Sequence, residues 1–301
     1  MSDYAAQVFS WSQRAQAQSA ALPALLVKAE KVAATVILGV HGRKRAGPGE
    51  SFWQYRPYSF GDTTQRIDWR RSALSDRVFI RESEWEAANT LWLWSDTGAR
   101  MDFKSHLAKE TKRDRGLLIS LAMASLAVRA HERIGGLGSD QLAGYGRSAL
   151  VKVAEHVLRP KDHTLPVMRR MQRHSAAIIV SDFLDDVESV KKSVVPLAQA
   201  GIRGHLVQVC DPAEETLPYD GRIEFLGLDT PQRYLARKTE GLRSAYAEKY
   251  QAHRESVRTL AKSLGWTFTV HRTDQPVMMC LLALYALILD APAGQRAGAA
   301  A

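Results

Sequence analysis

From Asn89 onward, short apolar runs alternate with longer segments of helical periodicity, and this alternation is what most constrains the fold. The runs at 91–94, 177–180 and 205–209 are rich in apolar residues, as expected of strands buried on both faces of a parallel sheet. A further strand is predicted at 267–270, a short strand pair at 134–137 and 141–145, and a hairpin arm at 223–225. Helices are predicted at 110–132, 148–158, 165–173, 187–200, 232–264 and 276–289. This order of elements predicts an α/β fold with a doubly wound, mostly parallel sheet.

The chain has 301 residues, enough for one large domain with an extension. We place N-terminal helices in 1–38, an irregular segment in 39–86, the α/β domain in 87–290 and a disordered Ala/Gly/Pro-rich tail in 291–301. The two cysteines give no disulfide framework. No secretory signal is evident, and the longest apolar run, at 277–289, is shorter than the roughly 20 residues that a membrane-spanning helix needs. We therefore expect a soluble, cytoplasmic protein.

The irregular segment contains a string that no helical or strand period explains. It reads GPGESFWQYRPY at 47–58, continues with GD at 61–62, and ends with RIDWRRSA at 66–73. Glycines and prolines that set turns alternate there with aromatic residues and arginines, and long irregular segments of this kind are usually functional or specifically packed. Between residues 41 and 81, nine Lys and Arg face four acids, a balance that favours acidic partners.

This string resembles the signature of the bacterial domain-of-unknown-function family fifty-eight, and the resemblance runs from about Leu22 to Leu289. It implies that the α/β domain is von Willebrand factor type A-like. It also implies a partnership with a MoxR-type AAA+ ATPase, for which the chain would be an adaptor or co-chaperone acting on a further target protein. The signature residues that we expect to pack the segment or to contact a partner are Arg56, Tyr58, Gly61, Asp62, Arg66, Asp68, Trp69 and Arg70. Of these, Asp62 is interpreted as a turn residue and Asp68 as a buried partner of nearby arginines.

Two carboxylates follow buried strands. Asp96 comes after the strand at 91–94, and Asp182 after the strand at 177–180. In open α/β sheets, ligands bind beyond the carboxyl ends of the strands, where the strand order reverses. If these two strands flank that reversal, both carboxylates converge on one crevice.

The family resemblance places a metal-ion-dependent adhesion site in that crevice. Asp96 and Asp182 match its two aspartates, and Thr164 is a loose candidate for its threonine. The two serines that would follow Asp96 are replaced by Gly98 and Arg100, so hydroxyl ligands that Mg²⁺ needs are missing. We hypothesise that Arg100 pairs with one or both aspartates in place of the cation. The alternatives are a Mg²⁺ site that still works, and a crevice from which Arg100 points into solvent.

Further acids lie at predicted strand ends and would form an acidic rim. This rim is either solvated loop charge or a surface on which the basic signature segment, or a basic surface of a partner, docks. Its members are Asp185, Asp211, Glu214 and Asp274.

Several enzymatic patterns are absent from the sequence. It has no Walker A loop, no His-Glu-x-x-His, no Cys-x-x-Cys and no Gly-x-Ser-x-Gly elbow. We therefore expect a non-enzymatic protein-binding module without a cofactor. Binding of Mg²⁺ is the one alternative to the absence of a cofactor. The alternatives are a nucleic-acid binder that uses the basic 41–81 segment, with bases stacked on its aromatic residues, and a metal-dependent hydrolase. The hydrolase would use Asp96 and Asp182, but the sequence offers it no evident general base.

Overall fold

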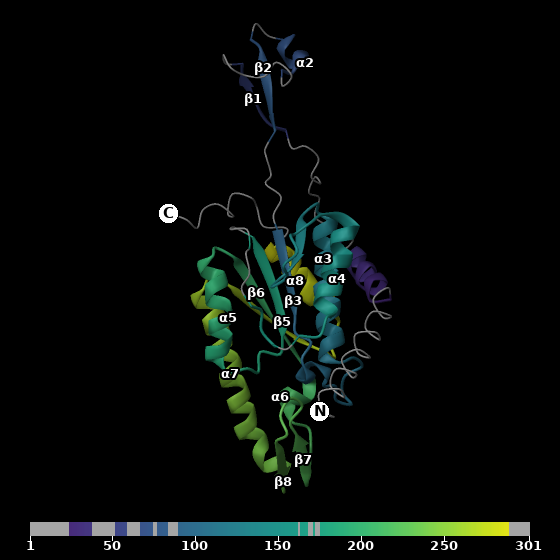
Figure 1. Ribbon diagram of the computed structural model, residues 1–301, viewed down its shortest axis with the longest axis vertical. Helices are drawn as coiled ribbons and strands as arrows, with labels where there is room; N and C mark the ends of the chain where they lie inside the picture. Colours follow the sequence, from purple (N-terminus) through teal and green to yellow (C-terminus); the bar gives the residue numbers. More distant parts are fainter. Residues whose placement is uncertain are drawn as a thin grey trace, which may run out of the picture. The chain divides into compact units, whose positions relative to one another are not determined.

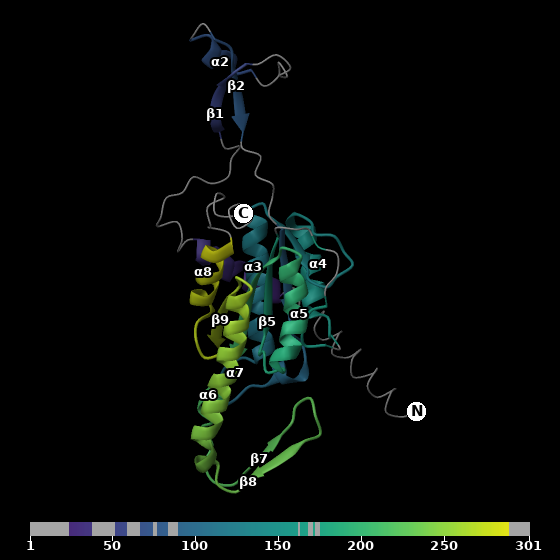
Figure 2. The same ribbon diagram turned by 90° about the vertical axis from the view of Figure 1, so that its left-hand side faces the viewer.

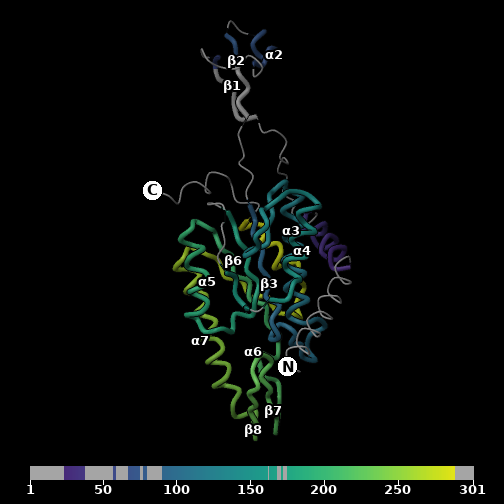
Figure 3. The backbone as a smooth tube through the Cα atoms, viewed as in Figure 1, coloured from purple at the N-terminus to yellow at the C-terminus, as the bar shows by residue number. Residues whose placement is uncertain are grey.

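The structure is a computed structural model that describes residues 24–37, 52–58, 67–74, 77–83, 90–161, 163–167, 171 and 175–288. Figure 3 draws the rest of the chain in grey. The chain divides into two compact units, one formed by residues 41–88 and the other by residues 1–40 together with 89–301. The larger unit holds the α/β sheet.

The sheet of the larger unit has five strands in the order β4-β3-β5-β6-β9, and every neighbouring pair is parallel. The predicted α/β fold with a mostly parallel sheet is therefore confirmed. Helices flank the sheet on both sides (Figure 1). The strands are β3 (Thr90–Ser95), β4 (Arg133–Gly136), β5 (Ala176–Ser181), β6 (Arg203–Cys210) and β9 (Thr267–Arg272).

The strand order reverses between β3 and β5. After β3 the chain places β4 on one side of it, and it then places β5, β6 and β9 in succession on the other side. This is the doubly wound order whose ligand crevice lies at the carboxyl ends of the first and third strands. Asp96 directly follows β3 and Asp182 directly follows β5, so the topology brings both to this point, as the sequence predicted.

Side chains alternate along β3 between two apolar cores. Leu91 and Leu93 join a cluster with α3 (Lys112–Arg129), α4 (Gly146–Leu158) and α8 (Val277–Ile288). Trp92 and Trp94 point the other way, into a cluster with α5 (Val187–Gln199) and α7 (Arg243–Ser263). All six residues of β3 are buried, which explains why the strand reads as a continuous apolar run.

The helix over residues 24–37 belongs to the larger unit. Its residues Ala29, Ala33 and Val36 are fully buried in the cluster that contains α3 and α8. The spacing of these three residues is that of one helix face. No helix among the described residues has both the length and the apolar character to cross a bilayer.

Two predicted helices differ in the structure. The long helix expected at 232–264 begins only at Arg243, because residues Arg233–Ala236 form β8, which pairs with β7 (Ile223–Leu226) in an antiparallel hairpin. The helix expected at 165–173 is not formed in residues 163–167, where Pro166 disfavours the helical conformation of Leu165.

The expected strand pair at 134–137 and 141–145 is reduced to one antiparallel bridge, between Ile134 and Gly144.

The smaller unit contains β1 (Phe52–Pro57), which pairs antiparallel with β2 (Phe79–Ser83), and the short helix α2 (Trp69–Ser72). Asp68 caps α2, since its side chain accepts a hydrogen bond from the backbone N–H of Arg71 at 2.9 Å. Asp68 is half-buried. It is therefore a half-buried helix cap, and its pairing with nearby arginines stays a prediction.

Candidate functional site

Asp96 and Asp182 lie together at the switch point, and both are buried, with 0% and 1% of their surface exposed. Asp96 accepts hydrogen bonds from the backbone N–H of Gly98 at 2.7 Å and from the Ser181 hydroxyl at 3.0 Å. Burial raises the pKa of Asp96 to about 6, and the negative charge of Asp182 adds to this rise. The Asp96 carboxyl is thus less readily ionised than an ordinary aspartate.

Lys112 supplies the main counter-charge of Asp182. Its Nζ is 3.1 Å from Oδ2 of Asp182 and 2.5 Å from Oε1 of Glu214, and only 1% of the Lys112 side chain is exposed. Burial lowers the pKa of Lys112, but the two carboxylates outweigh burial and hold this pKa above its ordinary value. The ammonium is therefore enclosed between two acids from different parts of the chain. Asp182 lies in the loop after β5, and Glu214 lies in the helix α6 (Pro212–Thr216).

The position of Lys112 in its helix explains why it needs these acids. Lys112 is the first residue of α3, directly after the N-cap Thr111. A helix N-terminus carries partial positive charge and disfavours cations. Sequence reasoning missed Lys112, although a lysine at the start of a helix is a local conflict that could have indicated an acidic neighbour.

Arg100 lies on the other side of Asp182. Its Nη2 is 3.5 Å from Oδ1 of Asp182 and 2.8 Å from Oδ2 of Asp185, and its Nε is 3.6 Å from Oδ2 of Asp229. The predicted neighbourhood of Arg100 and Asp182 is thus present in the structure. The closer partner of Arg100 is Asp185, and the closer cation of Asp182 is Lys112.

The donor set at this point does not fit a divalent ion. Both oxygens of Asp96 accept hydrogen bonds, and each oxygen of Asp182 faces a cationic nitrogen. The hydroxyl of Thr164 donates to Asp185 at 3.0 Å. Mg²⁺ requires a near-octahedral set of oxygen ligands, and no group of three metal-binding side chains occurs among the described residues.

A third cation, Lys161, lies near Asp96. Its Nζ donates to the backbone carbonyl of Ser95 at 3.0 Å and lies 4.6 Å from the centre of the Trp94 ring. Burial lowers the pKa of Lys161 to about 7, against the attraction of Asp96. Sequence reasoning missed this residue too, because it lies in the loop after α4, far from both aspartates in the chain.

The acids of the predicted rim are all engaged within the larger unit. Asp211 is fully buried and caps α6, in a capping box with Glu214. Asp185 is held by Arg100 and Thr164, while Asp274 pairs with Arg272 at 2.7 Å. These four residues are thus parts of local structure, and they do not form a free acidic surface.

The signature residues are only partly described. Tyr58 and Trp69 are 38% and 67% exposed, and Arg70 is also exposed. Arg56 is part of β1, but its side chain lies outside the described structure, as do Gly61, Asp62 and Arg66 entirely. An exposed Trp beside an exposed Arg is typical of residues that dominate protein interfaces.

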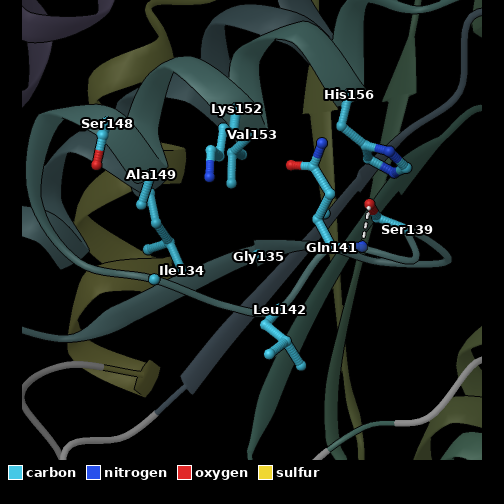
Figure 4. Close-up of a pocket in the computed structure, with 12 residues that line it drawn as sticks. Ile134, Gly135, Ser139, Gln141, Leu142, Ser148, Ala149, Lys152, Val153 and His156 are labelled. Carbon is cyan, nitrogen blue, oxygen red and sulfur yellow. Dashed lines mark hydrogen bonds between the residues drawn. The ribbon is translucent and has the colours of Figure 1, made fainter.

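Two pockets of the described structure share Ser139 and Gln141, in the segment after β4, and His156 of α4. One has a volume of about 60 Å³ and lies between β4 and α4, where Figure 4 shows Gln141, Lys152 and His156 around it. The other, of about 370 Å³, is lined by Trp94, Lys161 and His163 among others. Neither Asp96 nor Asp182 lines these two pockets.

Fold and site together define an α/β sheet domain whose switch-point carboxylates are neutralised by lysine and arginine side chains. Residues 54–256 match the model of the family described as "Protein of unknown function DUF58". The chain belongs to this family.

Similar proteins occur in mycobacteria. The chain is 24% identical over 282 residues to "Uncharacterized protein Mb1516" of Mycobacterium bovis and to "Uncharacterized protein Rv1480" of Mycobacterium tuberculosis, with 85% of each chain covered. Among solved structures it is similar to the conserved hypothetical protein BatB from Bacteroides thetaiotaomicron. That similarity has 12% identity and a TM-score of 0.35, and covers 68% of this chain and all of the other.

Proposed function

We propose that this protein is a non-enzymatic protein-binding module with a von Willebrand factor type A-like domain and a degenerate ion site. The observation that carries the proposal is the position of Lys112 Nζ between Asp182 and Glu214. A divalent ion in an adhesion site, or in a hydrolase, needs carboxylate oxygens that are free to coordinate it. Here the built-in ammonium and the Arg100 guanidinium hold those oxygens, so the carboxylates serve to fix the loops.

The smaller unit supports binding to protein. Its Trp69 and Tyr58 are exposed, and the last turn of α2 contains the basic residues Arg70 and Arg71. Trp, Tyr and Arg are the residue types enriched at interface positions that contribute most to affinity. We propose a MoxR-type AAA+ ATPase as the partner, on the basis of the family resemblance, and an adaptor or co-chaperone role for the chain.

The test is complex formation between the purified chain and the MoxR-type ATPase of the same organism, measured by gel filtration with and without nucleotide. Co-elution that Trp69→Ala weakens, and that the matched exposed variant Leu142→Ala leaves intact, is the expected result. Leu142 is 88% exposed and lies in the larger unit. Separate elution of the two proteins under both conditions contradicts the ATPase partnership.

A further inference from the structure

The β7–β8 hairpin is an exposed arm with apolar residues that no other described part of the chain covers. Every residue from Leu226 to Leu235 is exposed. The large apolar residues among them are Leu226 at 59%, Leu228 at 50%, Tyr234 at 58% and Leu235 at 47%. Figure 2 shows the arm projecting from the end of the larger unit where α6 lies. A lone two-stranded hairpin is at best marginally stable in water, so this arm needs support from elsewhere.

The register shows that both faces of the arm carry apolar side chains. Phe225 is opposite Tyr234 on one face, where Phe225 meets the ring of Tyr219 with 5.9 Å between the ring centroids. On the other face Leu226 is opposite Arg233 and Leu235 is opposite Glu224. β7 and β8 form a sheet of two strands only. Their outer edges can therefore accept an added strand through main-chain hydrogen bonds.

Two exposed arginines at the base of the arm have no salt-bridge partner among the described residues. Each of its three carboxylates is close to a cation: Asp220 to Arg243 at 2.9 Å, Glu224 to Arg233 at 3.8 Å, and Asp229 to Arg100 at 3.6 Å. The two arginines at the base are Arg222 and Arg237. The arm thus offers exposed leucines next to arginines whose charge is not compensated.

The tip of the arm is tied back to the switch point. Asp229, in the turn between β7 and β8, lies beside the same guanidinium that holds Asp185 and reaches Asp182. This contact places the tip of the arm beside Arg100 in the unbound chain. Such preorganisation lowers the ordering cost of binding.

We propose that the β7–β8 hairpin is a docking arm for a protein partner that presents an acidic segment with apolar side chains. This inference rests on the proposed function as a protein-binding module and names the surface and the partner's chemistry. A second copy of the chain is a poor match, because both copies carry the same Arg222 and Arg237 without a salt-bridge partner in the described structure, and the chain has a net charge of +9. A lipid surface is disfavoured because the carboxylates of Glu224 and Asp229 would enter it together with the leucines.

The test places a photo-crosslinking benzoylphenylalanine at position 235 of the full chain in the cells that produce it, with position 142 as the matched exposed control. The protein crosslinked from position 235 is identified, purified and titrated with the unmodified chain. We expect Leu226→Ser/Leu235→Ser and Arg222→Glu/Arg237→Glu each to weaken binding at least about tenfold. Leu142→Ser should leave the affinity unchanged.

Four outcomes overturn the proposal: no protein adduct specific to position 235, adducts only with a second copy of the chain, unchanged affinity of both arm variants, or binding instead to vesicles of phosphatidylcholine and phosphatidylserine. The crosslinking and gel-filtration experiments together separate this inference from the proposed ATPase partnership. An ATPase complex that forms, while no protein crosslinked from position 235 loses affinity for either arm variant, refutes the arm alone. An arm that captures a different acidic protein, while the ATPase elutes separately, refutes the ATPase partnership alone.

Discussion

Lys112 and Asp182 form an ion pair with 3.1 Å between Nζ and Oδ2, and each side chain is only 1% exposed. The pair joins the first turn of α3 to the loop after β5, and Glu214 extends it to α6. Desolvating two charges is costly, so such a pair holds a structure together chiefly because removing one partner leaves the other buried and uncompensated.

Lys112→Met is therefore expected to lower the free energy of unfolding by about 3–5 kcal/mol. The variant keeps most of the aliphatic volume but leaves Asp182 and Glu214 without their ammonium. Urea unfolding followed by far-UV circular dichroism measures the change. Lys109→Met removes a lysine from an exposed position nearby and should change the free energy by about 0.5 kcal/mol at most. Equal losses in the two variants would show that the buried pair does not stabilise the fold.

The pKa of Asp96 predicts a pH dependence. Because burial raises this pKa from 3.8 to about 6, the native state binds the proton more tightly than the unfolded chain. The Asp96 contribution to stability is thus favourable at low pH and is lost as the pH rises from about 4 to 6. The full rise corresponds to about 3 kcal/mol.

Asp96→Asn removes this titration while keeping an oxygen that can accept from Gly98. Relative to the wild type, the variant should gain stability between pH 4 and pH 7, up to about 3 kcal/mol. Urea midpoints measured across this pH range check the difference. Leu142→Asn, which changes an 88% exposed residue without a titratable group, is the control whose curve should run parallel to that of the wild type. A parallel curve for Asp96→Asn as well would mean that this carboxyl titrates normally.

The contact between Arg100 and Asp229 predicts local behaviour of the β7–β8 arm. Asp229 is 46% exposed, so Asp229→Asn should change global stability by less than about 1 kcal/mol. The same change should speed amide hydrogen exchange of residues 223–236, because the tip of the arm loses its tether. Glu248→Gln, exposed on α7, serves as the comparison. Unaltered exchange in the arm of the Asp229 variant would show that the arm is held from its base only.

The sequence was sufficient for the sheet and for one part of the site. Runs of buried residues located β3, β5 and β6, and the rule for strand ends then located Asp96 and Asp182. The predicted helix start at residue 232 was wrong. Tyr234 and Leu235 fit a strand as well as a helix, and only their pairing with β7 decides between the two. Tertiary pairing of this kind leaves little local trace in a single sequence.

The cations of the site were harder to predict than its acids. Arg100 is close in sequence to Asp96, which made it a candidate, whereas Lys112 meets Asp182 across 70 positions. The first turn of a helix is an unfavourable place for a cation. Lys112 is stable there because the fold brings Asp182 and Glu214 next to its ammonium. Local rules could have indicated an irregularity at Lys112, but they could not have named its partner.

The same cations determine how the site should respond to divalent ions. In the wild type, Lys112 and Arg100 are next to the two oxygens of Asp182, and their charges repel an incoming Mg²⁺. Titration with Mg²⁺ or Mn²⁺ should therefore show no micromolar binding, and the melting temperature should not change with millimolar Mg²⁺.

In the double variant Arg100→Ser/Lys112→Ala, Asp182 and Glu214 lose their cations, so Mg²⁺ should restore part of the lost stability through preferential binding to the native state. Sodium chloride at equal ionic strength controls for screening. Micromolar Mg²⁺ binding by the wild type that Asp96→Ala abolishes would instead establish a working ion site, because the built-in cations would then have to move aside.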